Sequence, residues 1–223
     1  MITVAMITMN EEGAVGKVIA DIRAAVPDAE VLVVDSSKDR TPEIAEAAGA
    51  RVIRQFPPQG YGRAMDLALR SAKGDVVVTL DCDDTYPVSM IRPMAERVLS
   101  GAAALVDGNR VHRKPEAMPW LNYAANRGFA ALASVLMMRW VEDLHSGMRA
   151  YRKSLIDEMA CDPSGPALPV ELLLRPISMG RRVEVVPIDY RERVGASTMQ
   201  PLPSAWWTLK RIVRVRIHGG AKG

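Results

Sequence analysis

Several features that mark other classes of protein are scarce in this chain of 223 residues. Its two cysteines, Cys82 and Cys161, lie far apart in the sequence, which argues against the disulfide framework of small secreted domains. The opening segment MITVAMITMNEE lacks the basic start and the long apolar stretch of a secretion signal. These absences predict a reducing compartment and a cytoplasmic location.

Long apolar runs, aromatic residues and paired histidines are scarce as well. The longest apolar stretch, residues 129–141, is interrupted by Arg139 and falls short of the roughly 20 residues of a membrane-spanning helix. Aromatic residues make up 5% of the chain, and no spacing typical of nucleic-acid-binding modules is present. The three histidines show no metal-ligand spacing. We therefore expect no nucleic-acid partner, and a protein that is soluble or attached to a membrane surface.

The remaining composition is that of an ordinary globular protein. Charged residues make up 25% and hydrophobic residues 48%, which excludes a disordered or collagen-like chain. The net charge is only +3, but basic residues gather near the end, at Lys210, Arg211, Arg214 and Arg216. Such a local cluster indicates a local anionic partner. The oligomeric state is left open.

Strand-like and helix-like patterns alternate through the first half of the chain. Apolar, β-branched runs at 2–8, 30–35, 50–55 and 75–81 are separated by helical patterns at 12–25, 41–48 and 62–72. This alternation is typical of βαβ units and a parallel sheet. Further on, the patterns predict a helix ending at Leu99, a strand in ALVDGNR, a helical segment at 120–140 and a strand ending near Tyr190. The expected fold is one α/β domain over residues 1–200, with a mostly parallel central sheet flanked by helices, followed by a basic tail at 201–223.

Carboxylates follow two of the predicted strands. Asp35 ends the run VLVV, and Asp81, Asp83 and Asp84 follow VVVTL. Ligands of an open parallel sheet bind at the carboxyl ends of its strands, and alternate carboxylates there can hold Mg²⁺ or Mn²⁺ against a diphosphate leaving group. We interpret DCDD as such a site, with a solvated acidic turn as the alternative because Asp-x-Asp is a common tripeptide. Cys82, between the carboxylates, is predicted to be a small buried hydrophobe.

The motifs together carry a family resemblance. In order along the chain they are MITMNEE, VVDSSKDRT, GYGRAMDLALRSAKGDVVVTLDCDDTYP, DGNR, DLHSGMRAYRK, VELLLR and VPIDYRERVGAS. The chain resembles the family-two glycosyltransferases, most closely the dolichol-phosphate mannose and polyprenyl-phosphate glucose synthases, whose members share a nucleotide-binding, Rossmann-like GT-A fold. The resemblance implies metal-dependent, inverting transfer of mannose or glucose from a GDP- or UDP-sugar to a dolichyl or polyprenyl phosphate.

The resemblance also implies residues that bind the donor. Asp35 is expected to contact its base or ribose, and Asp81 and Asp83 to bind the nucleotide and the metal, with Asp84 assisting the metal. Ser36 replaces a frequent second aspartate of the family, which leaves the donor's base open. Separately from the resemblance, Gly62 and its neighbour at position 60 are candidates to let the backbone approach a phosphate, an ordinary loop entry to a helix being the alternative.

Catalysis and acceptor binding are expected to involve Asp83, Arg110, Arg193 and Glu171. The two arginines resemble those that grasp the acceptor phosphate. A lipid phosphate is already ionised near neutral pH, since its second pKa is about 6, and needs no strong base. A neutral hydroxyl acceptor would instead need a carboxylate base, Asp143 or Glu171, although Glu171 at a helix start has a structural alternative. A nucleotide-sugar-binding module without turnover is a further alternative, against which DCDD argues.

The tail combines apolar and basic residues at helical spacing. Trp206, Leu209, Val213 and Ile217 recur every three or four positions, with arginines between them. This pattern predicts a helix in peripheral contact with a membrane surface, with a packed C-terminal element as the alternative. Three further residues, Met137, Met138 and Trp140, are expected to lie in the core, with contact to lipid as the alternative.

Overall fold

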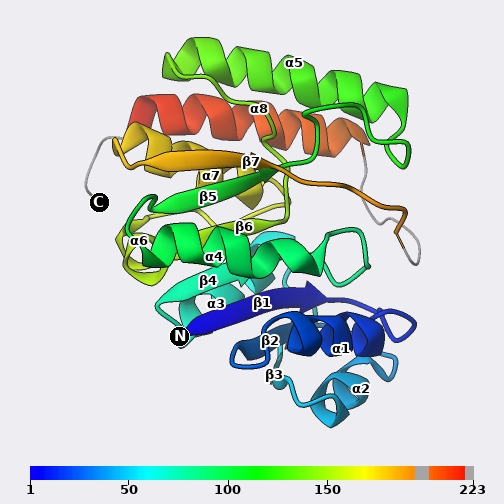
Figure 1. Cartoon of the computed structure of the whole chain (residues 1–223). Coiled ribbons are helices and arrows are strands. Elements are labelled where there is room, and N and C mark those ends of the chain that lie inside the picture. The colour runs from blue at the N-terminus through cyan, green and yellow to red at the C-terminus, as the bar shows by residue number, and fades with distance from the viewer. Residues whose placement is uncertain (194–200, 219–223) are drawn as a thin grey trace.

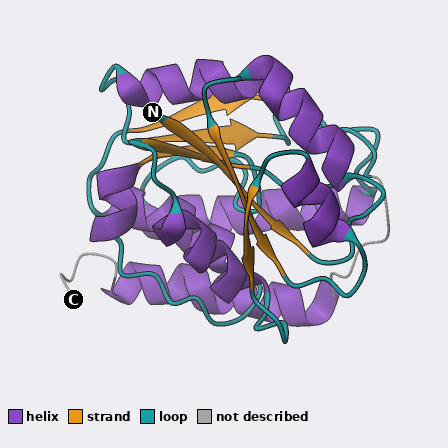
Figure 2. Cartoon of the chain, turned by 90° about the horizontal axis from the view of Figure 1, so that it is seen from below, coloured by secondary structure: helices purple, strands orange, loops and turns teal. Residues whose placement is uncertain are grey.

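A twisted sheet of seven strands lies between two layers of helices in the computed structural model, which describes residues 1–193 and 201–218 (Figures 1 and 2). The strands are β1 (Ile2–Thr8), β2 (Glu30–Asp35), β3 (Arg51–Arg54), β4 (Val76–Thr79), β5 (Leu105–Asn109), β6 (Arg149–Arg152) and β7 (Val183–Pro187). The helices are α1 (Val15–Ala25), α2 (Thr41–Ala47), α3 (Tyr61–Ser71), α4 (Ile91–Leu99), α5 (Trp120–Met137), α6 (Lys153–Glu158), α7 (Leu168–Ser178) and α8 (Pro201–His218), with a short 3₁₀ turn, η1 (Val88–Met90).

The strand order, β3-β2-β1-β4-β6-β5-β7, sets where a ligand can bind. The chain passes outward from β1 through β2 to β3, and then returns to the other side of β1 to form β4. Ligands of open α/β sheets bind at the carboxyl ends of strands where the order reverses in this way. The crevice beyond β1 and β4 is therefore the expected place for the site.

The mostly parallel sheet predicted from the sequence is confirmed. The exception is β6, which pairs antiparallel with both β4 and β5 and was not predicted. Its four residues, RAYR, carry two arginines, so the hydrophobic pattern of a strand is absent from it. Pairing with its two neighbours in the sheet, rather than its own sequence, makes this segment a strand.

The continuous apolar runs of the central strands serve two cores at once. Along β2, Val31 and Val33 face the core beneath α1, α2 and α4, whereas Leu32 and Val34 face the core beneath α3, α7 and α8. Because successive side chains of a strand point to opposite faces, a strand covered by helices on both sides needs apolar residues at every position.

The tail forms a helix, as the sequence predicted. α8 packs against α7 and α5, and its residues Ile212 and Val215 are buried in the core. α8 is therefore also a packed C-terminal element, which the sequence offered as the alternative to contact with a membrane. The domain boundary predicted near residue 200 falls outside the described residues. Within the described part of the chain, no helix is both long enough and apolar enough to cross a bilayer.

The core position predicted for Met138 and Trp140 is wrong. Met138 is 85% exposed and Trp140 is 75% exposed, whereas Met137 is partly buried against the core. α5 ends at Met137, and Met138 takes a left-handed conformation with φ of 53°. The chain thus leaves the helix with these two side chains directed to the surface.

Candidate active site

Asp81 follows β4 at the point where the strand order reverses. Its carboxylate lies against the backbone of Gly147, where an added Cβ would stand 2.7 Å from Oδ2 of Asp81. Gly147 is itself held, because its N–H donates to the hydroxyl of Tyr86 at 2.8 Å and its carbonyl accepts from the hydroxyl of Thr79 at 2.7 Å. Glycine at position 147 therefore allows the loop before β6 to approach the carboxylate of Asp81.

Two carboxyl groups at this end of the sheet have a raised pKa. Burial, reinforced by Asp83, raises the pKa of Asp81 to about 6, and no hydrogen bond from the described residues reaches its carboxylate. Burial also raises the pKa of Glu11, which follows β1, to about 6; Arg193 acts in the opposite direction. Carboxylates that are desolvated and close to one another attract a cation.

Asp83 is shared between the loop and an arginine. Its Oδ1 accepts a hydrogen bond from the hydroxyl of Thr85 at 2.6 Å, and its Oδ2 lies 3.1 Å from Nη2 of Arg193. The same Nη2 lies 3.7 Å from Oε1 of Glu11. The backbone N–H of Arg191 donates to the carbonyl of Thr85 at 3.0 Å and brings this segment to the site. The positively charged guanidinium of Arg193 therefore lies beside the carboxylates of Asp83 and Glu11.

The structure does not bring Asp84 into the cluster as a third metal ligand. Asp84 has a left-handed φ of 62°, and its Oδ2 lies 2.8 Å from Nζ of Lys17 on α1. Nowhere in residues 1–193 and 201–218 do three or more Asp, Glu, His or Cys side chains converge as a metal site. Asp81 and Asp83 still fit Mg²⁺ or Mn²⁺, because Mg²⁺ is usually held by one or two carboxylates together with water and substrate phosphates.

Asp35, the expected contact to the base or ribose, is fully buried and saturated by protein groups. It accepts hydrogen bonds from the hydroxyl of Thr8 at 2.7 Å, from Ser37 and from the guanidinium of Arg54. It thus organises the end of β2. Beside it, the side-chain oxygen of Gln55 is buried without a hydrogen-bond partner among the described residues, a feature that sequence reasoning missed.

Glycine at position 62 is required by packing and leaves no space for a ligand to approach. A Cβ at this position would stand 2.3 Å from the carbonyl oxygen of Pro163 and 2.6 Å from that of Gly165. The first turn of α3 therefore rests directly on the loop before α7. Gly60 is different, because its φ is 94° and nothing lies within 4 Å of its Cβ position. Of the two glycines, Gly60 is the one with free space beside it.

Arg110, at the end of β5, is buried and fixed in orientation. Its Nε lies 2.8 Å and its Nη2 lies 2.9 Å from the two carboxylate oxygens of Asp143, and its Cζ lies 5.2 Å from the ring centroid of Tyr190. Asn126 of α5 also donates to Asp143, at 2.8 Å. Burial acts to raise the pKa of Asp143, but Arg110 and Asn126 hold it well below its ordinary value. A carboxylate stabilised in this way is a poor general base.

Glu171 lies apart from the carboxylate cluster and joins two helices. It is fully buried in α7, accepts a hydrogen bond from Nε of Arg175 at 2.8 Å, and pairs with Arg211 of α8. Arg211 also lies 3.0 Å from Asp162. These contacts give Glu171 a structural role at the α7–α8 junction.

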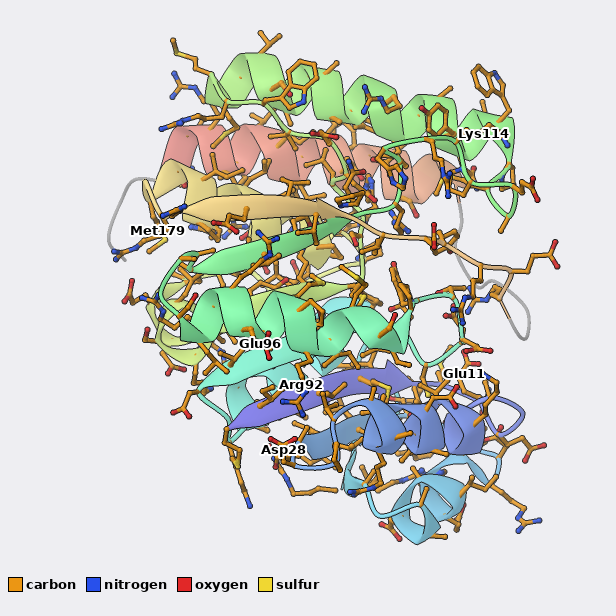
Figure 3. The ribbon with its side chains drawn as sticks, in the orientation of Figure 1. Glu11, Asp28, Arg92, Glu96, Lys114 and Met179 are labelled. Atoms are coloured by element: carbon orange, nitrogen blue, oxygen red, sulfur yellow. The ribbon has the colours of Figure 1, made fainter. Side chains whose placement is uncertain are left out.

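The sequence contained a signal for Glu11 that the strand-end argument did not use. Glu11 lies just beyond β1, as Asp35 and Asp81 end or follow β2 and β4, and the same reasoning places it in the crevice. The hydroxyl of Thr41 accepts a hydrogen bond from the backbone N–H of Glu11 at 2.9 Å. Figure 3 shows Glu11 and Lys114 at the same side of the molecule, opposite Met179.

Comparisons with known proteins identify the family. Residues 3–160 match Glycosyl transferase family 2. A dolichyl-phosphate hexose transferase of Haloferax volcanii is 45% identical over 215 residues, which cover 96% of this chain and 93% of that protein. An undecaprenyl-phosphate mannosyltransferase of Micrococcus luteus is 30% identical over 210 residues, covering 86% of this chain and 84% of that protein.

Solved structures agree on the fold. Glucosyl-3-phosphoglycerate synthase of Mycobacterium tuberculosis, in complex with Mn²⁺, UDP-glucose and phosphoglyceric acid, superposes with a TM-score of 0.73 at 23% identity, covering 97% of this chain and 79% of that protein. At this level of identity the likeness concerns the fold alone, which is the GT-A fold of glycosyltransferases. The chain therefore belongs to glycosyl transferase family 2 and is a glycosyltransferase.

Proposed function

We propose that this protein transfers one hexose from a nucleoside-diphosphate sugar to a polyprenyl phosphate, with inversion at the anomeric carbon. The observation that carries the proposal is the pair Asp81 and Asp83 at the switch point of the sheet, where the half-buried Asp81 has a raised pKa and receives no hydrogen bond from the described residues. The acceptor class is supported by the name of the Haloferax relative, which matches over nearly its whole length.

Asp81 and Asp83 are proposed to hold Mg²⁺ or Mn²⁺, which when bound would neutralise charge on the departing diphosphate. Oδ2 of Asp83 is taken by Arg193 in this structure, so ligation through that oxygen requires Arg193 to move away. The arginine is then available to an anionic group of the acceptor. Binding of the metal and the donor would thus release Arg193 to bind the acceptor.

Acceptor binding in this proposal depends on arginine rather than on a base. A phosphate near neutral pH already carries a nucleophilic oxygen, and a planar guanidinium binds two of its oxygens at once. Arg193 is partly exposed, and Arg110 is held in place by Asp143 and Tyr190. Because Asp143 is a poor base, a hydroxyl acceptor deprotonated by it is disfavoured.

The direct test compares a polyprenyl phosphate with the polyprenol of the same chain length, using labelled GDP- or UDP-hexose with Mn²⁺. We expect labelled lipid from the phosphate alone. Equal transfer to the alcohol would overturn the proposed acceptor class and favour a hydroxyl acceptor. Absence of transfer to either lipid, with donor binding intact, would leave the binding-module alternative.

The arginines are tested by steady-state kinetics. Arg193→Gln should raise the KM for polyprenyl phosphate by roughly tenfold, because a charge-assisted contact to phosphate is lost, with a smaller effect on the KM for the donor. Arg110→Ala should also raise the KM for polyprenyl phosphate. Its kinetics are compared per folded molecule, because the variant leaves Asp143 buried without its counter-ion and so destabilises the fold. The control is Arg113→Gln, whose pair with Asp189 at 3.1 Å is exposed and should affect neither KM. Equal losses for donor and acceptor would contradict the assignment.

The proposed location is the cytoplasmic face of a membrane that contains the acceptor. Both cysteines are free thiols, and Cys82 is buried between the carboxylates, as its predicted role as a small hydrophobe requires. Free thiols are typical of a reducing compartment. The two thiols therefore support this location.

A further inference from the structure

The outward side of α5 is mostly apolar. Its exposed residues after the first turn are small or apolar, and Leu121 precedes them: Ala124, Ala125, Gly128, Ala131 and Val135. The polar exceptions are Asn122, which is exposed in the first turn, and Arg127, which is half-buried. Leu121 and Val135 are each 75% exposed. A helix on the surface of a soluble protein normally presents polar or charged residues to water, and a contiguous apolar surface marks a site of interaction.

Tryptophans surround this apolar side. Trp120 and Trp140 stand at the two ends of α5 and are 67% and 75% exposed. α8 packs beside α5, as Figure 1 shows, and exposes Trp206, Leu209, Val213 and Ile217. Of the four tryptophans in the chain, the three that are exposed thus lie on or next to these two helices. Tryptophan settles at the boundary between water and lipid, because its ring is large and apolar and its N–H is polar.

The charge on the two helices has one sign. Neither α5 nor α8 contains aspartate or glutamate, and Lys210 and Arg216 are exposed on α8. An open pocket of about 340 Å³ at the C-terminal end of α5 is lined by Met137 and Val215 together with Arg139 and Arg216. Basic residues beside an apolar face complement anionic lipid, whereas two copies of this face would bring like charges together.

We propose that the outer faces of α5 and α8 form a docking surface for an anionic lipid bilayer, with both helices lying in the plane of the headgroups. The inference deepens the proposed function, since a polyprenyl phosphate is presented at such a surface. α5 connects the docking surface to the acceptor side of the site. Asn126, on the inner side of α5, donates a hydrogen bond to Asp143, which in turn holds Arg110. The helix that contacts lipid therefore also positions an acceptor-side arginine.

The test is flotation of the purified full-length protein with vesicles of phosphatidylcholine, alone or mixed with phosphatidylglycerol. Wild-type protein should float with the anionic vesicles at low salt, and less at high salt because the attraction is screened. The double variant Leu121→Glu/Val135→Glu should lower the partition coefficient about tenfold, because it removes apolar contact and adds negative charge. The matched control is Leu99→Glu, at the end of α4, where Leu99 is 49% exposed, and it should bind as wild type does.

Three results would overturn the docking surface. The first is unchanged flotation of the double variant, and the second is failure of the wild type to bind anionic vesicles at low salt. The third is a concentration-dependent dimer that the double variant abolishes, which would assign the face to a second copy of the chain.

Turnover assays separate this proposal from the proposed function. With a short-chain polyprenyl phosphate in solution, the double variant should retain the wild-type rate, whereas its rate with a long-chain acceptor in vesicles should fall about tenfold, following its partition coefficient. Equal loss with both acceptors would overturn the docking role. Inactivity of the wild-type protein with both acceptors would reject the proposed function, and the flotation result would still decide the docking surface.

Discussion

At Asp81, the proposed ligation of a metal and the stability of the fold oppose each other. Its carboxylate is poorly solvated and lies beside Asp83, so its pKa in the folded protein rises from an ordinary value of 3.8 to about 6. Between these two pH values the folded state binds more protons than the unfolded state. The contribution of Asp81 to stability therefore falls as pH rises through this window, and the charged group destabilises the metal-free protein at neutral pH.

The variant Asp81→Asn should consequently stabilise the metal-free protein at pH 7, by on the order of 1 kcal/mol since the group is partly exposed and its charge is partly screened. Thermal unfolding should show a higher Tm than wild type at pH 7, and a smaller difference below pH 4. A lower Tm at pH 7 would contradict the electrostatic account of the site. Asp189→Asn, at a side chain that is 70% exposed, should change neither value.

Between α7 and α8, a buried ion pair determines how the C-terminal helix attaches. Glu171 pairs with Arg211, whose side chain is 1% exposed, and with Arg175 on its own helix. Breaking a buried pair by removing one partner leaves the other charge without compensation, which costs far more than the loss of an exposed pair. The geometry thus assigns Glu171 to the attachment of α8.

Glu171→Gln is therefore expected to destabilise the protein by about 3–5 kcal/mol while the kcat per folded molecule stays close to that of the wild type. Urea unfolding measures the first quantity, and turnover normalised to the folded fraction measures the second. Glu158→Gln is the control, because Glu158 and its partner Arg181 are 45% and 48% exposed, and a change below about 0.5 kcal/mol is expected. A large loss of kcat in folded Glu171→Gln would restore the general-base role.

The elements differ in how far local pattern could predict them. The strands β1, β2 and β4 are apolar at nearly every position, and this signal is strong because helices cover both of their faces. The strand β6 has no such pattern. At the start of α2 the helix has no side-chain cap, and the hydroxyl of Thr41 donates to Asp39 and accepts from the backbone N–H of Glu11, contacts that a local pattern does not predict.

For the protein as a whole, donor binding should appear as a rise in thermal stability. A ligand that binds only the folded state stabilises it by about 2.7 kcal/mol at a concentration of 100 times its Kd. We expect GDP- or UDP-sugars, but not both equally, to raise the Tm, and to do so more strongly with Mn²⁺ than without it. Equal shifts with and without Mn²⁺ would contradict metal ligation by Asp81 and Asp83. Asp81→Asn is the matched variant in which the Mn²⁺-dependent part should vanish.

Local pattern determined the alternation of strands and helices and the acidic end of β4, because hydrophobic period and strand ends are properties of neighbouring residues. The tertiary structure decided what those residues meet. Asp84 pairs with Lys17, and Glu171 pairs with Arg211. Met138 lies at the surface although its apolar side chain favoured the core. These outcomes depend on contacts between segments far apart in the chain, on which the period of a single segment carries no information.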